Sequence, residues 1–292
     1  MFDVAIVGGS FAGLSAALQL GRTRRRVAVF DSGLRRNRFA ASSHGFLAQD
    51  GRAPGAIVAD ARAQLAAYPT VHWFDATVTA VSGSKDAFTL DAGNTLHEAR
   101  RIVLATGVVD TLPDIPGLAQ RWGRTVFHCP YCHGFELQQG PIAVIATSPA
   151  SLHQAQLLPE WGSVTFFLNG ALSLSEDEAR RLAARGVTVE ATPVAAIVDD
   201  ARVVLADGRS EPFAGVFTAS RTAPASPLAA QLGCAHEEGL LGPFVRTDAM
   251  KATSVPGVFA CGDVARVAGN VALAVGEGAL AGTAVHASLV FA

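Results

Sequence analysis

The residues with the clearest chemistry are two cysteines separated by two positions, Cys129 and Cys132, in the run 128–134. Such a pair can close a small disulfide ring and reopen it with little backbone movement, and a neighbouring histidine can take or return the proton that thiolate chemistry requires. Pro130 suits the first turn of a helix after Cys129, because its missing N–H would have no helical partner there. The spacing predicts a redox-active disulfide.

A zinc site is the alternative, because Cys-x-x-Cys also has metal-ligand spacing. A structural zinc ion needs two further ligands, normally a second close pair, and Cys234 and Cys261 are 27 residues apart in the sequence. We therefore predict no metal, a small core role for Cys261, and no role for Cys234, which has no visible partner in a predicted loop.

Two histidines flank the cysteine pair. Each disulfide exchange step moves a proton, and imidazole titrates near neutral pH, so a histidine here is an acid/base candidate. His133 is the first choice and His128 competes with it. The alternative for either is a structural hydrogen bond.

Composition excludes several classes of protein. Half of the 292 residues are hydrophobic and 16% are charged, which favours globular domains with large cores. The net charge of −2 gives no electrostatic reason to expect nucleic acid or an anionic membrane. Four cysteines in 292 residues are too few for the disulfide framework of a secreted protein, and no signal peptide is visible. The run 271–292 is apolar but contains Glu277 and His286, so we expect a packed helix and a soluble, cytoplasmic protein.

The N-terminal segment has the pattern of a dinucleotide-binding βαβ unit. An apolar strand (2–7) precedes the glycine-rich turn 8–13, a helix extends to about Gly21, and the next strand (27–30) ends at Asp31. Glycines allow the tight turn, the helix N-terminus faces a pyrophosphate, and the carboxylate takes a ribose hydroxyl. Ser10 replaces the middle glycine, which we interpret as tolerated because serine is small and can donate a hydrogen bond.

Two further strand ends and one loop extend this candidate site. The strand before Gly107 ends in a small-residue turn, and residues 257–263 repeat that pattern with Asp263 after a glycine. Asp263 could bind sugar hydroxyls or cap a helix. The helix after Asn270 could direct its N-terminus at the cofactor. The loop 35–51 could bring arginine and asparagine to phosphates, or be an ordinary surface loop.

The middle of the chain has a second nucleotide-domain pattern without its chemistry. The turn at 146–151, after the predicted strand 141–146, lacks a glycine fingerprint. Residues 169–171, after the predicted strand 163–168, lack an arginine that could hold a 2′-phosphate. NADPH is therefore a doubtful cofactor.

Together these motifs resemble the low-molecular-weight thioredoxin reductase family of flavoproteins, over essentially the whole chain and in the correct order. The resemblance implies an α/β protein with two Rossmann-like three-layer domains. A discontinuous FAD-binding domain (1–110 and 244–292) would surround a central redox domain (111–243) that resembles an NADPH-binding domain. It also implies a homodimer.

The resemblance assigns roles residue by residue. Cys132 would be the flavin-proximal thiol and Cys129 the thiol that exchanges with substrate. FAD would be held by Gly8, Ser10, Phe11, Ala12, Gly13, Asp31, Arg36, Asn37, Gln49, Val78, Ala105, Thr106, Gly107, Gly262, Asp263, Val271 and Ala272.

The departures from the reductases are informative. His133 stands where they have an acid, and the NADPH motifs are missing. Residues 129–136 and 44–47 are similar to a branch containing dithiol oxidases, which close disulfides in natural products of the gliotoxin and holomycin type and pass electrons from flavin to oxygen. We therefore predict an FAD-dependent thiol–disulfide oxidoreductase that oxidises a dithiol. The alternatives are an NADPH- or ferredoxin-dependent reductase of the thioredoxin reductase type and a non-catalytic redox-sensing flavoprotein. The substrate would be a small-molecule dithiol or disulfide, or a thioredoxin-like protein.

Overall fold

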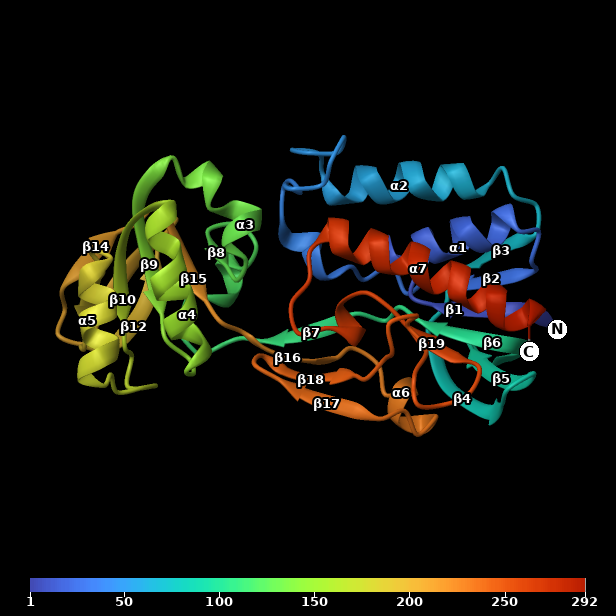
Figure 1. Ribbon diagram of the computed structural model, residues 1–292. Coiled ribbons are helices and arrows are strands. Elements are labelled where there is room, and N and C mark those ends of the chain that lie inside the picture. Colours follow the sequence, from blue (N-terminus) through green and yellow to red (C-terminus); the bar gives the residue numbers. More distant parts are fainter. Residues whose placement is uncertain (292) are drawn as a thin grey trace. The chain divides into compact units, whose positions relative to one another are not determined.

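The computed structural model describes residues 1–291 and forms two compact units (Figure 1). Both units combine parallel strands with helices, which confirms the predicted α/β class with Rossmann-like sheets. The first unit consists of Met1–Arg38, Phe46–Val109 and the chain from Thr222 onward, and the second of Phe39–Gly45 and Asp110–Arg221.

A seven-stranded sheet forms the centre of the first unit. Its strand order is β3-β2-β1-β6-β5-β4, and β19 also pairs with β6. Strands β1, β2, β3, β6 and β19 pair in parallel with one another, whereas β5 pairs antiparallel with β6 and β4 antiparallel with β5. The strands are β1 (Phe2–Val7), β2 (Val27–Phe30), β3 (Val71–Phe74), β4 (Val78–Ser84), β5 (Ala87–Ala92), β6 (Thr95–Leu104) and β19 (Val258–Ala260).

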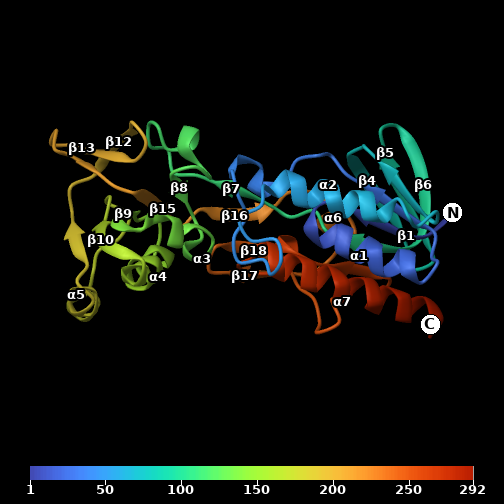
Figure 2. The same ribbon diagram turned by 90° about the horizontal axis from the view of Figure 1, so that it is seen from above.

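Three long helices accompany this sheet: α1 (Phe11–Arg22), α2 (Pro54–Leu65) and α7 (Val271–Val290). Helix α7 lies alongside α1 in both ribbon views (Figures 1 and 2). A Cβ atom at Gly278 would lie 2.1 Å from the carbonyl oxygen of Ala12, so glycine is needed where the two helices meet. The short elements α6 (Leu228–Gln231), β17 (His236–Gly239) and β18 (Gly242–Val245) complete the unit.

Helix α7 is long and apolar enough to cross a membrane by composition alone. In the structure it packs on α1, and Glu277 in its middle accepts a hydrogen bond from the Gly262 amide. Because α7 packs on α1 and its one carboxylate is hydrogen-bonded within the protein, the predicted packed helix is confirmed over 271–290. Ala292, the last residue of the predicted run, lies outside the described residues.

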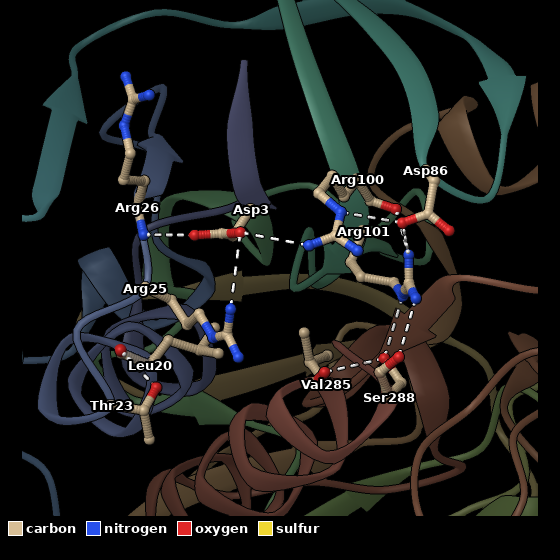
Figure 3. A network of polar contacts seen from close by, with 10 residues as sticks. All are labelled: Asp3, Leu20, Thr23, Arg25, Arg26, Asp86, Arg100, Arg101, Val285 and Ser288. Atoms are coloured by element: carbon tan, nitrogen blue, oxygen red, sulfur yellow. Dashed lines mark hydrogen bonds and ion pairs between the residues drawn. The ribbon is translucent and has the colours of Figure 1, made fainter. Parts of the chain in front are cut away.

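A fully buried arginine joins the sheet to the far end of α7. The guanidinium of Arg101, near the middle of β6, donates to the Asp86 carboxylate at 2.8 Å and to both the hydroxyl (3.0 Å) and the carbonyl oxygen (2.8 Å) of Ser288. Arg100 donates to the same carboxylate from a half-exposed position (Figure 3). Because an unpaired buried charge is costly, this network fixes the last turn of α7 on the sheet.

The second unit contains a five-stranded parallel sheet of order β11-β10-β9-β15-β8 and an antiparallel sheet of order β12-β13-β14. Its helices are α3 (Pro130–His133), α4 (Ala150–Leu157) and α5 (Glu176–Ala184). The strands are β8 (Val126–Phe127), β9 (Gln139–Ile145), β10 (Gly162–Phe167), β11 (Thr188–Glu190), β12 (Val194–Val198), β13 (Arg202–Leu205), β14 (Ser210–Pro212) and β15 (Gly215–Thr218).

The compact units divide the chain at 109/110, within one residue of the predicted domain boundary at 110/111, and at 221/222, some distance before the predicted boundary at 243/244. Residues 222–243 join the first unit, because Leu228, Ala229 and Cys234 enter its hydrophobic core. Residues 39–45 join the second unit although they follow β2 in the chain. The two connecting segments, β7 (Val108–Thr111) and β16 (Arg221–Pro224), pair with each other.

Candidate active site

The carboxyl ends of β1, β2, β6 and β19 meet at one edge of the first sheet, because these strands are parallel and paired. Four segments predicted to bind the cofactor follow these strands directly: the turn 8–13, Asp31, the turn 105–107 and the turn 261–263. The structure therefore brings together segments that lie more than 200 residues apart in the chain.

The glycines of the first turn leave no room for side chains. A Cβ atom at Gly8, where φ is +104°, would lie 2.2 Å from the carbonyl oxygen of Ala105, and one at Gly13 would lie 1.8 Å from that of Gly8. A Cβ atom at Gly9 would meet the ring of Trp73 at 2.4 Å. These contacts form a bare backbone cradle at the N-terminus of α1, as a pyrophosphate requires.

Ser10 and Asp31 complete the cradle. Ser10 is the N-cap residue of α1 and its side chain makes no capping hydrogen bond. Asp31 directly follows β2, and its carboxylate accepts a hydrogen bond of 3.2 Å from the Gly9 amide. Phe11 and Ala12 form the first turn of α1. The carboxylate thus fixes the turn and stands where a ribose hydroxyl is expected.

Arg36 lies against Asp263. Its guanidinium donates to the carboxylate at 2.9 Å, with both side chains mostly buried. Two buried polar atoms beside Arg36 in the sequence, Nε of Arg35 and Oδ1 of Asn37, have no hydrogen-bond partner. Buried polar atoms of this kind call for a ligand, because leaving them unpaired costs free energy. The bare cradle and these orphaned atoms fit a dinucleotide such as FAD.

The N-terminus of α7 offers further amides. Asn270 caps the helix, and its Oδ1 accepts from the Leu273 amide at 2.9 Å. The amides of Val271 and Ala272, the first two helical residues, have no partner within the helix. They could therefore bind an anionic or carbonyl oxygen of the cofactor.

The turn at 261–263 is held by a buried charge cluster that the sequence did not reveal. One oxygen of Glu277 accepts from the Gly262 amide at 2.9 Å, and the other from the ammonium of Lys251 at 2.6 Å. Arg266 approaches the same carboxylate at 3.3 Å. The side chains of Lys251 and Glu277 are only 14% and 15% exposed. In the sequence, only the presence of one acidic residue, Glu277, in the apolar run 271–292 could have indicated this cluster.

We expect Glu277→Gln to weaken FAD binding about tenfold, because the amide can still accept from Gly262 but leaves the two cations without their carboxylate. The measurement is titration of the apoprotein with FAD, followed by quenching of flavin fluorescence. Glu98→Gln, an exposed position on β6, is the matched control. Equal dissociation constants for both variants would show that Glu277 does not support the turn.

Two of the predicted cofactor residues make contacts within the protein. The side-chain oxygen of Gln49 accepts from Arg52 at 2.7 Å, and Val78 is a buried core residue at the start of β4. Trp73, which the sequence analysis did not single out, packs its ring over Gly9 and donates from Nε1 to Asp75 at 2.9 Å. Hydrophobic periodicity in the sequence does not predict that Trp73, near the end of β3, packs against the glycine turn.

In the second unit, Cys129 and Cys132 form a disulfide, with Cα atoms 5.3 Å apart. Pro130 begins the short helix α3, and Cys129 precedes it as the N-cap residue. A Cβ atom at Gly134 would lie 2.7 Å from both the Pro130 carbonyl oxygen and the Trp161 ring, so glycine lets the chain turn tightly after the pair. The predicted disulfide is present, and no group of three or more His, Cys, Asp or Glu residues within 1–291 could hold a metal ion.

His133 is enclosed beside Cys132. Its ring stacks on Phe127 at 4.3 Å between centroids. Burial, with a smaller contribution from the charge of His44, lowers the pKa of His133 from 6.5 to about 4. His133 is therefore a neutral imidazole in the disulfide form. A thiolate formed beside it would favour its protonation.

His128, the competing acid/base candidate, stacks on Trp122 at 5.8 Å. The side-chain nitrogen of Gln154 on α4 donates to the His128 carbonyl oxygen at 2.7 Å, which holds the backbone just before Cys129. The side-chain oxygen of the buried Gln154 has no hydrogen-bond partner.

The two remaining cysteines are buried. Burial and the nearby Glu277 carboxylate raise the pKa of the Cys261 thiol to about 12, which makes it an inert core residue, as expected. Cys234 does have a partner, because its thiol lies 3.6 Å from the Thr253 hydroxyl, and burial raises its pKa as well.

The turn after β9, where a nucleotide fingerprint would stand, is closed by its own side chains. The Thr147 amide donates to the fully buried Ser151 hydroxyl at 3.0 Å, and the Ala150 amide donates to the Ser148 hydroxyl at 3.3 Å. Asn169, after β10, accepts from the Val194 amide at 2.9 Å. These groups serve the local fold, whereas a fingerprint presents free amides to phosphate.

Comparisons with known proteins agree with this architecture. A family model described as pyridine nucleotide-disulphide oxidoreductase matches residues 2–278. An oxidoreductase structure from Agrobacterium tumefaciens is 55% identical, with a TM-score of 0.97 and 99% coverage of both chains. The crystal structure of HlmI is 40% identical, with a TM-score of 0.92, covering 99% of this chain and 93% of that one.

A curated relative, thioredoxin reductase sirT from Leptosphaeria maculans, is 35% identical over 98% of this chain and 94% of its own length. The family match spans both the glycine cradle and the disulfide, and family membership implies a flavin cofactor. The chain belongs to the pyridine nucleotide-disulphide oxidoreductase family, as a thioredoxin reductase-like member with a Cys129–Cys132 disulfide.

Proposed function

We propose that this protein is an FAD-dependent thiol–disulfide oxidoreductase that oxidises a dithiol to a disulfide. The observation that supports this direction is the turn after β9, where the Thr147 and Ala150 amides donate to the Ser151 and Ser148 hydroxyls rather than to a nucleotide. Without a nucleotide donor, the thiol substrate is the electron source that we propose, and reduced ferredoxin is the alternative donor.

The cysteine pair performs the exchange chemistry. A substrate thiolate attacks Sγ of Cys129, the Cys129–Cys132 bond breaks, and Cys132 leaves as a thiolate with the electron pair. The second substrate thiolate then attacks the substrate sulfur of this mixed disulfide and releases Cys129 as a thiolate. The substrate leaves as a disulfide, two electrons reside on the cysteine pair, and the two thiol protons have been released.

His133 is the proposed proton acceptor. It is neutral in the disulfide form and adjoins Cys132, so the thiolate that forms there stabilises the imidazolium electrostatically. His128 remains the second candidate for this role. FAD, when bound, supplies the two-electron acceptor that reoxidises the cysteine pair and passes the electrons to oxygen or another acceptor.

An NADPH-dependent reductase is the second candidate function. The matched family is described as pyridine nucleotide-disulphide oxidoreductases, and the relative from Leptosphaeria maculans is named a thioredoxin reductase. That reaction would use the same cysteines and FAD, with electrons flowing towards the disulfide. A ferredoxin-dependent reductase and a redox-sensing flavoprotein without turnover are the further alternatives.

The partners follow from the same proposal. The substrate is a small-molecule dithiol or a thioredoxin-like protein, and neither nucleic acid nor a membrane is a partner. By the family resemblance the protein is a cytoplasmic homodimer.

Anaerobic reduction of the flavin tests the direction of electron flow. We expect excess dithiothreitol to bleach the visible flavin band of the holoprotein, and equimolar NADPH to leave it unchanged, because the Thr147 and Ala150 amides of the turn after β9 are already hydrogen-bonded to side chains. Readmitting air should restore the band and produce peroxide. Steady dithiol turnover in air would count against a redox-sensing module.

Rapid bleaching by NADPH would overturn the proposal in favour of the reductase. Bleaching by reduced ferredoxin but not by dithiothreitol would favour the ferredoxin-dependent enzyme. Glutathione, a monothiol, is the control reductant, because it cannot resolve its own mixed disulfide within one molecule and should act far more slowly.

A further inference from the structure

A buried glutamine on α4 reaches the backbone that leads into the redox pair. Gln154 is 8% exposed, and its Nε2 donates to the carbonyl oxygen of His128 at 2.7 Å. His128 directly precedes Cys129, the N-cap residue of α3. Within the second unit, this bond therefore joins α4 to the chain one residue before the cysteine that we propose exchanges with substrate.

The bond fixes which way the Gln154 amide points. A carbonyl oxygen only accepts hydrogen bonds, so the NH₂ group of Gln154 must face His128, and its Oε1 must face elsewhere. Oε1 is buried and has no hydrogen-bond partner within residues 1–291. An unpaired buried acceptor costs free energy, and an apolar side chain of similar size would avoid that cost. The stability of the fold alone therefore does not account for a glutamine at this position.

The other buried residues of α4 serve packing or the local turn. Ala150 and Ala155 are apolar, and the Ser151 hydroxyl accepts from the Thr147 amide in the turn before the helix. Gln154 instead directs its amide to the segment that carries the cysteine pair. The side chain thus connects a regular helix of the second unit to the reactive segment.

The two redox states restrict this segment to different degrees. In the disulfide form the sulfur–sulfur bond joins Cys129 to Cys132, and the Cys132 amide donates to the Cys129 carbonyl oxygen at 3.2 Å. Reduction removes the covalent link, so non-covalent contacts such as the bond from Gln154 then hold the backbone before Cys129. A restraint of this kind removes more conformational entropy from the open dithiol than from the closed ring, which is already restricted.

We infer that Gln154 is a positioning residue for the redox pair: by holding the His128 carbonyl it keeps Cys129 close to Cys132 after the disulfide opens. The effective concentration of one sulfur at the other is thereby raised, which favours the disulfide and speeds its reformation. This inference rests on the proposed function, in which the pair must return to the disulfide in every turnover.

Equilibrium with glutathione measures this effective concentration. When the bond between Cys129 and Cys132 forms, the pair loses two electrons and two protons, and one glutathione disulfide takes them and becomes two glutathione thiols. The holoprotein would be equilibrated without oxygen in glutathione buffers, quenched with acid and alkylated, and mass spectrometry would give the fraction of dithiol. In Gln154→Met we expect the equilibrium constant for disulfide formation to fall at least about threefold, a shift of roughly 14 mV.

Two further variants make the measurement specific. Gln154→Asn keeps the amide but is one methylene shorter and loses its reach to His128, so its equilibrium constant should fall as well. Gln156→Met makes the same replacement two residues further along α4 and is the matched control, which should keep the constant of the unsubstituted protein. Urea denaturation of each variant would record its stability.

An unchanged constant in both Gln154 variants, or an equal shift in Gln156→Met, would overturn the inference. A loss of stability in Gln154→Met without a shift in the constant would also overturn it, because the glutamine would then have a structural role only. The glutathione equilibrium involves neither oxygen nor a dithiol substrate. A shifted constant in a protein whose flavin dithiothreitol does not reduce would therefore support the inference and refute the proposed function.

Discussion

Cys132→Ser is expected to abolish dithiol oxidation while the protein keeps its FAD. Serine cannot form the disulfide that joins Cys132 to Cys129, so the substrate thiolate has no sulfur–sulfur bond to attack. The predicted loss in turnover is about a thousandfold or more, as for removal of other covalent participants. Peroxide formation in air with dithiothreitol measures turnover, and the visible absorbance of the purified protein measures bound FAD.

The remaining thiol should still exchange. In Cys132→Ser, Cys129 is free to react with 5,5′-dithiobis(2-nitrobenzoate), and mass spectrometry should find one stable adduct there because no neighbouring thiol can displace it. Cys234→Ser is the matched control, since its buried thiol lies in the core of the first unit, hydrogen-bonds to Thr253 and takes no part in the proposed exchange. Full turnover in Cys132→Ser would refute the proposed electron path.

Arg101→Ala is expected to cause the largest loss of stability. The substitution removes a fully buried guanidinium and every hydrogen bond that it donates to Asp86 and Ser288, and leaves a cavity under the last turn of α7 (Figure 3). Breaking a buried network of this kind costs about 3–5 kcal/mol in the free energy of unfolding. Urea denaturation, followed by far-UV circular dichroism, would measure it.

Arg100→Ala is the matched control, because Arg100 binds the same carboxylate from a half-exposed position. Exposed ion pairs contribute about 1 kcal/mol or less, so this neighbour should lose little stability. Equal losses in the two variants would mean that the bonds to Ser288 do not hold α7 on the sheet. Arg101→Met should fall between them, because its aliphatic chain fills part of the cavity without a charge.

The sequence by itself determined the features that depend on local chemistry. The glycines at positions 8 and 13 predicted a tight backbone turn for a phosphate. In the structure a Cβ atom at either position would collide with a backbone oxygen, so only glycine fits there. The spacing of Cys129 and Cys132 predicted a disulfide because two intervening residues can close the ring within one helical turn. Apolar runs predicted buried strands, and the order of strand, glycine turn, helix and strand predicted a Rossmann βαβ unit, whereas the two-domain architecture was implied by the family resemblance.

Other features of the candidate site exist only once distant segments meet. Arg36 was predicted to bind a phosphate, and the pairing of β19 with β6 also places Asp263 within hydrogen-bond distance of it, 227 residues along the chain. Glu277 holds the turn at 261–263 because α7 returns over α1. Hydrophobic periodicity in the sequence predicts which face of a helix or strand is buried, but not which distant segment packs against that face.

The proton affinity of His133 is also a tertiary property. An imidazole in a peptide titrates near neutral pH, which made His133 a general acid/base candidate. Enclosure by Phe127 and the approach of His44 from a segment some ninety residues earlier lower its pKa to about 4. The sequence determined which groups the redox site contains. Tertiary packing decided their protonation, because desolvation and charge act through space rather than along the chain.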